Sequence, residues 1–452
     1  MGERPISTLD WRGAGAEVEH DLLLRNARVL DPRAGIDAAH DVLVRRGTIA
    51  ELAEPGAAAP SDAEVIEADG MSVYPAFFDP HVHLRTPGRE DEEEIETGTR
   101  AAAAGGFCGV VAMANTEPPI DDAAGIGSLR DRARHDAAVP AGFVACVTRA
   151  LAGEELTEMA ELADAGAVAL SDDGLPIRSA RVLRRALQYQ RLAGLPIALH
   201  EEDPELSGEG AMNEGAVSAA LGLTGIPSVS ESTMIARDAA LASYEGARIH
   251  VQHLSARESV AAVEAAKQDG VGITCEVTPH HLTLTDEEVR SLDSRFKMNP
   301  PLRAEVDRQA LIDGLRSGAI DCIATDHAPH ASEEKEVPFE QAAMGVIGLE
   351  TAFAAIYTEL VLPGVLDLAT VVERFSGGAD PFGFAAPRIA PGAEANLVLI
   401  DTEAEWEAGA EGWESRSDNS CFADRRLRGR VLMTVAAGRV AYRQRSFAMG
   451  VA

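Results

Sequence analysis

Lysine is scarce in this sequence, and acidic residues greatly outnumber basic ones. Lys267, Lys297 and Lys335 are the only lysines among 40 basic residues, whereas Asp and Glu total 73, giving a formal net charge of −33. A chain this negative would repel a phosphate backbone or an anionic membrane surface. The charge balance therefore argues against nucleic acid and membrane lipid as main partners.

Cysteine is also rare, and its spacing suits neither disulfides nor metal binding. The five cysteines are odd in number, widely spread and without C-x-x-C spacing, which argues against a disulfide framework and against a thiolate zinc site. No apolar run approaches the roughly 18 residues of a membrane span, and the first residues carry acids where a signal peptide would be apolar. We expect a soluble protein in a reducing cytoplasm.

What the sequence does contain is a globular composition, with 46% hydrophobic and 25% charged residues over a length of 452. This length fits an α/β barrel with a smaller companion domain. Apolar runs alternate with helical stretches over residues 75–388, and eight such runs predict a closed (β/α)8, or TIM-like, barrel. The runs are 73–78, 109–113, 143–147, 167–170, 197–199, 249–251, 272–275 and 322–324.

The two ends of the chain have strand patterns of a different kind. Short apolar runs separated by turn residues occur over residues 20–74, and strand patterning returns over residues 389–452. We expect both ends to complete one small β-sandwich domain. Residues 1–19 mix Gly, Pro and charge without a period, which predicts a loose N-terminal tail.

The sequence Asp79-Pro80-His81-Val82-His83-Leu84-Arg85 directly follows the first apolar run. In a strand, residues two apart share a face, so Asp79, His81 and His83 are expected to point the same way. Two converging imidazoles suit zinc, which accepts neutral imidazole nitrogen. An H-x-H pair also occurs in ordinary loops, so this motif alone leaves both interpretations open.

Metal-type side chains also follow nearly all of the remaining predicted strands, at the strand ends where barrel enzymes carry their catalytic groups. Taken singly, each has a structural explanation, such as a core histidine or an Asp-Gly turn. Together, four histidines and two carboxylates are enough nitrogen and oxygen ligands for two metals sharing a bridging hydroxide. These residues are His81, His83, Asp173, His200, His253 and Asp326, while His20, His40, His135 and His250 are expected to be surface or structural.

Over residues 21–445 the chain resembles the dihydroorotase family of the amidohydrolase superfamily, in its class I bacterial type. The resemblance is carried by segments at 79–88, 115–116, 171–174, 198–201, 253–255, 297–303 and 324–330. It implies a zinc-dependent cyclic amidohydrolase of pyrimidine biosynthesis, which converts N-carbamoyl-L-aspartate to L-dihydroorotate with loss of water. The family's fold is a barrel of the amidohydrolase type, in agreement with the strand pattern.

The resemblance also implies a role for each matching residue. His81 and His83 would bind one Zn²⁺, His200 and His253 a second, Asp173 would bridge both together with a hydroxide, and Asp326 would be both ligand and acid/base. Substrate would be bound by Arg85, Asn115, Asn299, His330 and the backbone of Gly345. An arginine supplies the fixed bidentate cation that a carboxylate substrate needs in so acidic a protein.

Lysine scarcity separates this chain from similar families. Dihydropyrimidinases, hydantoinases and allantoinases bridge their metals with a carboxylated lysine, and none of the three lysines follows a strand where that bridge belongs. The chain departs from the usual pattern at Ala114, where a proline normally stands, and at Met344, which replaces a common phenylalanine. These changes bear on substrate affinity and loop rigidity.

Two alternatives stay open at this point. One is another cyclic-amide hydrolase, such as an allantoinase or a dihydropyrimidinase or hydantoinase-like enzyme. The other is a non-catalytic relative that acts as a partner of aspartate transcarbamoylase, although the retained ligands favour an enzyme, which could itself form a homodimer and associate with that partner. The charged run 333–336 is interpreted as a solvated loop in preference to a mobile lid.

The excess of acidic residues gives a hypothesis about salt. An acidic, arginine-rich sequence fits either a GC-rich genome or adaptation to high salt, and we favour the second because a heavily charged surface stays soluble at high ionic strength. Melting temperature and activity are then expected to rise from dilute buffer to molar KCl. Thermal melting and turnover measured across that range test the hypothesis. Full stability in dilute buffer would contradict it.

Overall fold

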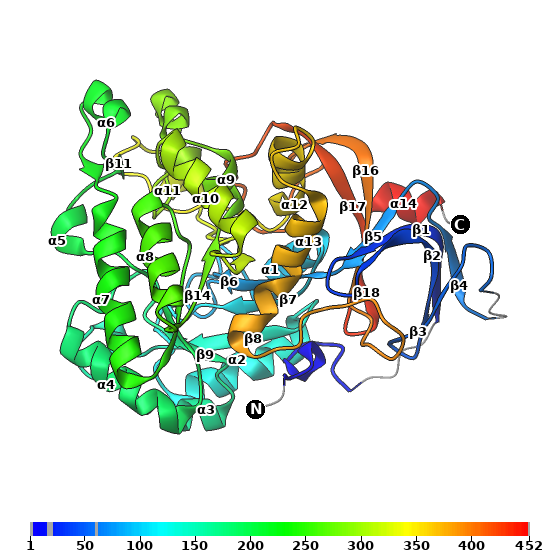
Figure 1. Cartoon of the computed structure of the whole chain (residues 1–452), viewed down its shortest axis with the longest axis horizontal. Coiled ribbons are helices and arrows are strands. Elements are labelled where there is room, and N and C mark those ends of the chain that lie inside the picture. The colour runs from blue at the N-terminus through cyan, green and yellow to red at the C-terminus, as the bar shows by residue number, and fades with distance from the viewer. Residues whose placement is uncertain (1–2, 16–20, 59–61, 451–452) are drawn as a thin grey trace.

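The protein is described here from a computed structural model, which covers residues 3–15, 21–58 and 62–450. It contains a barrel and a separate sheet beside it (Figure 1). The barrel sheet consists of eight parallel strands in the order β15-β14-β13-β10-β9-β8-β7-β6. Their bounds are β6 (Phe77–Val82), β7 (Phe107–Ala112), β8 (Ala141–Ala145), β9 (Ala169–Ser171), β10 (Ile197–Leu199), β13 (Arg248–Val251), β14 (Gly272–Val277) and β15 (Cys322–Ile323).

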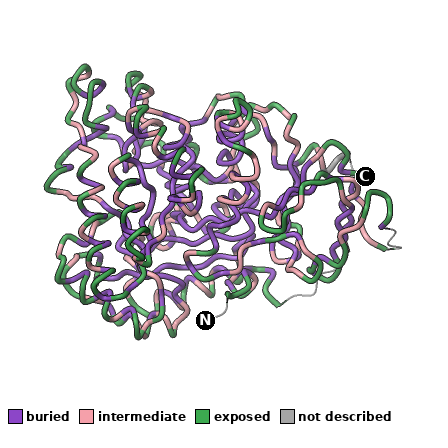
Figure 2. Tube along the Cα trace, in the orientation of Figure 1, coloured by how far each residue is buried: buried purple, intermediate pink, exposed green. Residues whose placement is uncertain are grey.

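The barrel closes between its first strand and the chain that follows its last one. Val82 forms a parallel bridge with His327, and the His83 N–H donates to the His327 carbonyl at 2.8 Å. The strand interiors are continuously buried, whereas the outer helices alternate buried and exposed residues (Figure 2). This arrangement confirms the predicted (β/α)8 barrel.

The outer layer contains the helices that connect the barrel strands, together with short helical turns in the loops. The longer helices are α1 (Ile95–Ala104), α2 (Ala123–Asp136), α3 (Met159–Ala165), α4 (Ala180–Ala193), α7 (Val229–Glu245), α8 (Arg257–Gln268), α10 (Glu305–Ser317) and α13 (Leu368–Ser376). The short ones are α5 (Pro204–Ser207), α6 (Ala216–Leu221), α9 (Pro279–Thr283), α11 (Ser332–Lys335) and α12 (Ala352–Ile356), whereas α14 (Arg445–Gly450) lies beside the separate sheet (Figure 1). Across the described ranges, no helix has the length and apolar character needed to cross a membrane.

The second sheet draws its strands from both ends of the chain, as predicted. Its order is β18-β17-β16-β5-β1-β2-β3, with β4 also pairing with β1. The strands are β1 (Leu22–Asp31), β2 (Ile36–Arg45), β3 (Thr48–Ala53), β4 (Glu64–Glu67), β5 (Ser72–Pro75), β16 (Leu397–Glu407), β17 (Arg426–Ala436) and β18 (Arg439–Arg443). A short pair, β11 (Met212–Asn213) with β12 (Gly225–Ile226), lies outside both sheets.

The first apolar run, interpreted from the sequence as one strand over 73–78, is divided between the two sheets. Its first part is β5, which pairs with β16 in the second sheet, and after Ala76 the chain continues as β6 of the barrel. Both parts are fully buried. An apolar pattern reports burial and not which sheet a strand joins, so the division was not visible in the sequence.

Residues 3–15 do not form the loose tail that the sequence pattern predicts. Ile6, Leu9 and Trp11 are buried in the main core, and Asp10 bridges to Ala141 at the start of β8. These apolar side chains therefore cover the amino end of the barrel. Three apolar residues in a polar stretch are too few for a periodic signal, although they are sufficient to anchor the segment.

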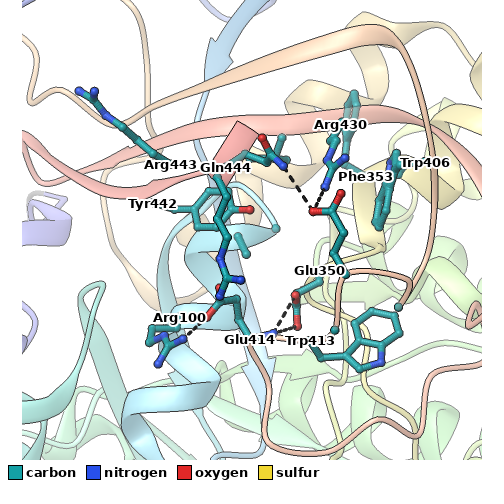
Figure 3. Close-up of a pocket in the computed structure, with 18 of the residues that line it drawn as sticks. Arg100, Glu350, Phe353, Trp406, Trp413, Glu414, Arg430, Tyr442, Arg443 and Gln444 are labelled. Atoms are coloured by element: carbon teal, nitrogen blue, oxygen red, sulfur yellow. Dashed lines mark hydrogen bonds and ion pairs between the residues drawn. The ribbon is translucent and has the colours of Figure 1, made fainter. Parts of the chain in front are cut away.

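A cavity of about 570 Å³ lies where the barrel meets the second sheet, and Figure 3 shows its lining. Burial raises the pKa of Glu350 in this lining to about 7. Its carboxylate accepts hydrogen bonds from the backbone N–H groups of Glu414 and Ser415, at 3.0 and 3.1 Å. None of the predicted site residues lines this cavity. The segment 414–419, however, leads from the cavity to the carboxyl end of the barrel.

Candidate metal centre

The six residues proposed as metal ligands from the sequence all lie at the carboxyl end of the barrel. Each is 7% exposed or less. Their positions relative to the strands are His81 in β6 and His83 just after it, Asp173 after β9, His200 directly after β10, His253 after β13 and Asp326 after β15. The barrel therefore gathers side chains that are up to 245 residues apart in the chain into one cluster.

The carboxylate of Asp173 lies at the centre of this cluster. Its Oδ1 atom is 3.5 Å from His81 Nε2 and 3.9 Å from both His200 Nδ1 and His253 Nε2, and its Oδ2 atom is 3.5 Å from His83 Nε2. Oδ1 is buried and has no hydrogen-bond partner. A buried anion without a partner is costly, so its position among four imidazoles suits a site that binds cations.

The donor atoms form two overlapping groups within which all atoms lie within 4.8 Å of one another. One group contains His81, His83 and Asp326, and the other His81, Asp173 and His253. His200 adjoins the second group, with its Nδ1 atom 2.9 Å from His253 Nε2. Imidazole nitrogen and carboxylate oxygen without thiolate form the donor set of hydrolytic zinc, and the residues therefore fit a metal.

The electrostatics of the cluster also favour cation binding. Burial raises the pKa of Asp173, but the neighbouring imidazoles, His81 first, hold it well below its usual range. The pKa of Asp326 is lowered in the same way, with His81 and His83 acting against burial. Burial and then His200 lower the pKa of His253 to about 3. Burial lowers the pKa of His81 and of His200, but the surrounding carboxylates, Asp173 first for His81 and Glu202 first for His200, raise both above the usual range. These two imidazoles therefore hold protons that a metal would displace on binding.

Glu276, which was not identified from the sequence, contacts the side of the His81 ring that faces away from Asp173. It is fully buried in β14, with Oε1 2.6 Å from His81 Nδ1 and Oε2 3.0 Å from His250 Nε2. Burial raises the pKa of Glu276, but His81 and His250 lower it to about 2. A carboxylate on the outer nitrogen of a ligating histidine fixes its ring and tautomer. An acidic residue in the middle of an apolar strand was the sequence signal for this role.

His250, expected to be surface or structural, is therefore structural and fully enclosed, since its Nδ1 atom lies 2.8 Å from Thr274 Oγ1. His40 and His135 lie outside the cluster, and His20 is outside the described residues. Asp79 lies in the same strand as His81, but its side chain contacts the segment after β15. It accepts hydrogen bonds from the Thr325 hydroxyl at 2.6 Å and from the Thr325 N–H at 3.2 Å. Asp79 thus closes the barrel instead of adding a metal ligand.

One of the predicted substrate-binding residues, Asn115, contacts the cluster directly, and a second, Asn299, is linked to it through Glu202. The Asn115 Oδ1 atom lies 2.9 Å from His83 Nδ1, and its Nδ2 donates to Asp173 at 3.4 Å. Asn299 Nδ2 donates to Glu202 Oε2 at 2.5 Å, and the same oxygen lies 3.3 Å from His200 Nε2. The Asn115 amide therefore lies beside the His83 imidazole, and the Asn299 amide shares the Glu202 carboxylate with His200.

Arg85 and His330, two further residues predicted to bind substrate, lie next to each other. Arg85 Nε donates to the Pro329 carbonyl and lies 3.0 Å from Glu92 Oε2, while its Nη2 atom is 3.4 Å from His330 Nε2. Its Nη1 atom makes no hydrogen bond with any described residue. Arg85 also adopts a positive φ of 53°, as do His253 and Asp326. Such backbone conformations are costly for non-glycine residues and cluster at functional sites.

Gly345 has a conformation that a larger residue could not share. Its φ is +148°, and a Cβ atom would lie 2.8 Å from Ala328 Cβ and 2.9 Å from His330 Nε2. The Gly345 N–H donates to the Lys297 carbonyl at 3.0 Å, and its own carbonyl accepts from Asn419 Nδ2 at 3.1 Å. The predicted backbone contact with substrate therefore involves groups that already have protein partners.

Asn419 belongs to the segment 414–419, whose part in the site the sequence did not indicate. Its side chain also accepts the His330 N–H, and Ser415 Oγ donates to Glu93 at 2.5 Å. Glu93 in turn lies 3.1 Å from His327 Nε2, the residue after Asp326. A loop between two strands of the second sheet thus completes the barrel site, and no local pattern in the sequence marks such a contact.

An eight-stranded parallel barrel with histidines and carboxylates at its carboxyl end defines the class of metal-type amidohydrolase barrels. Solved structures share this fold: the L-hydantoinase (dihydropyrimidinase) from Arthrobacter aurescens superposes with a TM-score of 0.82 and 24% identity, covering 93% of this chain and 96% of that one. At that identity the likeness shows the fold alone.

Sequence comparison identifies the family. A family profile described as Dihydro-orotase-like matches residues 70–259. The dihydroorotase of Citrifermentans bemidjiense is 44% identical over 93% of this chain and 99% of its own length. The dihydroorotase of Anaeromyxobacter dehalogenans strain 2CP-C is 45% identical over 94% of this chain and 98% of its own. The chain belongs to the dihydroorotase family.

The contact between Glu276 and His81 leads to a testable prediction. Replacing Glu276 with glutamine should lower metal affinity about 10- to 100-fold, because the amide cannot hold the His81 ring as a carboxylate does. Competition with a chelator, followed by metal analysis, measures the change. Glu258→Gln on α8 is the matched control, because Glu258 pairs with Arg257 away from the cluster. Equal metal retention by the two variants would refute this role.

Proposed function

We propose that the protein is a zinc-dependent dihydroorotase, which interconverts N-carbamoyl-L-aspartate and L-dihydroorotate in the cytoplasm as a step of pyrimidine biosynthesis. The observation that carries the proposal is the position of Arg85 beside a complete set of metal-type residues. The cluster suits hydrolysis of a cyclic amide, and a buried guanidinium at its edge suits a ring that carries a carboxylate. Membership of the dihydroorotase family supports the same substrate.

The roles of the residues follow from this proposal. His81 and His83 would hold one Zn²⁺ and His200 and His253 a second, with Asp173 between them and Asp326 near the first. The 3.5 and 3.9 Å distances from Asp173 to the four imidazoles support this division. Substrate would be held by Arg85, Asn115, Asn299, His330 and Gly345.

Asp326 would move the proton in this reaction. Zinc, when bound, supplies Lewis acidity and lowers the pKa of water toward neutrality. In the hydrolytic direction, Asp326 would accept a proton from the attacking water and pass it to the ring nitrogen as the amide bond breaks. The carboxyl group of Asp326 is ionised in the cluster, because the His81 and His83 imidazoles lower its pKa against the effect of burial. In the biosynthetic direction the same proton transfers run in reverse.

The lysines argue against the hydantoinase-type alternative. Its metal bridge, a carboxylated lysine, would have to follow β9, where this chain has Asp173. Lys267, Lys297 and Lys335 instead donate to backbone carbonyls elsewhere. A non-catalytic partner of aspartate transcarbamoylase is disfavoured because every candidate ligand is present in the cluster. We propose a homodimer that could associate with that transcarbamoylase, and light scattering with and without the partner would test both associations.

A substrate panel tests the proposed function directly. Purified protein, loaded with zinc and checked by metal analysis, is assayed with dihydroorotate, dihydrouracil, hydantoin and allantoin. We expect turnover of dihydroorotate above the other three, because the other three carry no ring carboxylate for Arg85 to bind. Lack of dihydroorotate turnover by metal-loaded protein would overturn the proposal.

Replacing Asp326 with asparagine tests the proton transfer. The variant should retain metal but lose about 10²- to 10⁴-fold in kcat, because the amide cannot accept the proton. Steady-state kinetics and metal analysis measure both quantities. Asp313→Asn is the matched control, because Asp313 lies on α10 with its side chain 57% exposed and paired with Arg316. A near-normal kcat for Asp326→Asn would show that Asp326 does not transfer the proton.

A further inference from the structure

The three lysines of this arginine-rich chain share one property: each donates to backbone carbonyl oxygens. Lys267 Nζ donates to Ala319 at 2.8 Å, and Lys297 Nζ donates to Glu340 at 2.9 Å. Lys335 is the extreme case, since its ammonium donates to three carbonyls. An ammonium offers three donors around a point, whereas the guanidinium of arginine is a flat fork.

The three carbonyl oxygens around Lys335 are those of Lys297 at 3.1 Å, Ala343 at 2.9 Å and Gly345 at 3.0 Å. Lys335 is 6% exposed. Among the described residues, no carboxylate lies within ion-pair distance of its ammonium, so the carbonyl dipoles are its immediate partners. Lys335 therefore joins two separate segments of the chain, around 297 and 343–345, at one buried point.

Both segments lead directly to residues proposed to bind substrate. Lys297 is two residues before Asn299, and its carbonyl also accepts the N–H of Gly345. The carbonyl of Met344, between the two residues that Lys335 holds, lies 3.0 Å from His330 Nε2. A shift of these segments would move Asn299, His330 and Gly345 together.

The short helix that carries Lys335 has a second contact with the site. One residue earlier, the Glu334 Oε2 atom lies 2.9 Å from His330 Nδ1, and the Glu334 carbonyl accepts the Ala343 N–H at 3.0 Å. The run 333–336, expected to be a solvated loop, is therefore anchored at Lys335, while Glu333 and Glu336 are exposed. The sequence showed the charges of this run but not which of its residues faces inward.

We propose that Lys335 is a positioning residue that fixes the side of the site formed by residues 297–299 and 343–345, and thereby sets substrate affinity. Its ammonium binds the carbonyls of Lys297, Ala343 and Gly345 and contacts none of the six metal-type residues. The inference rests on the proposed function for the identity of the substrate, whereas the link between the two segments is independent of it.

The protonation of Lys335 offers a measurement that a purely structural role would not affect. Burial, and then the charge of Lys297, lower the pKa of Lys335 to about 8, against the weaker opposing effects of Cys421, Asp293 and Glu334. Below this pH the ammonium supplies three donors, and above it the amine has only two for three carbonyls. KM should therefore rise as the pH passes through about 8.

The central experiment compares Lys335→Met and Lys335→Arg with wild-type protein and with Lys267→Met, whose lysine binds the Ala319 carbonyl and Asp321 elsewhere in the fold. Both Lys335 variants should raise KM for dihydroorotate about 10- to 100-fold with a smaller change in kcat, because the misplaced contacts bind substrate. Their metal content should equal that of wild type, and Lys267→Met should leave KM unchanged. The alkaline rise in KM should occur in wild type and be absent from Lys335→Met.

Amide hydrogen exchange over residues 343–346 is measured on the same proteins, because it needs no substrate. Lys335→Met should lose protection at the Gly345 N–H, and Lys267→Met should keep it. If wild type does not turn over dihydroorotate, the proposed function fails while the exchange data still decide the role of Lys335. Should Lys335→Met not fold, Lys335→Arg and the wild-type pH profile decide. A wild-type KM in either folded variant, or unchanged exchange at Gly345, would overturn the proposal.

Discussion

A single buried carboxylate facing four imidazole rings is the constraint around which this structure is arranged. Asp173 has an oxygen with no hydrogen-bond partner, within 4 Å of nitrogen atoms of three histidines. An isolated buried anion is costly, and the four imidazoles around Asp173 offset that cost. The carboxyl ends of the barrel strands must therefore lie close together, so that the imidazoles reach Asp173. The outer contacts, such as that of Glu276 with His81, keep the rings oriented once they arrive.

The sequence contained enough information for the barrel and for the six metal-type residues at its carboxyl end, because each of them lies at or just after the end of a recognisable apolar strand. His200 and Asp326 could be placed from local pattern alone, since strand ends in a barrel meet at one rim. Glu276 lies inside such a strand and not after it, so the pattern of polar residues at strand ends does not mark it. The burial of residues 3–15 was missed because it depends on three apolar side chains without periodicity.

The parts of the site that come from distant loops could not be predicted from the sequence. Asn419 reaches His330 and Gly345 from a loop of the second sheet, and Lys335 joins the segments around 297 and 345. Such contacts depend on how separate segments pack, and the pattern of a single segment carries no trace of its partner. The same limit explains why one apolar run, 73–78, was assigned to one strand when it serves two sheets.

The place of Asn419 in the chain has a consequence for the newly made protein. During synthesis all six metal-type residues, the last being Asp326, leave the ribosome before the segment 414–419, and the barrel strands can begin to pair as they emerge. A nascent chain can thus gather its imidazoles and carboxylates while His330 and Gly345 still lack the Asn419 side chain that ties them together. The metal-type cluster can therefore assemble before the rest of the site. The site is complete only after the segment 414–419 has been synthesised and Asn419 has bound His330 and Gly345.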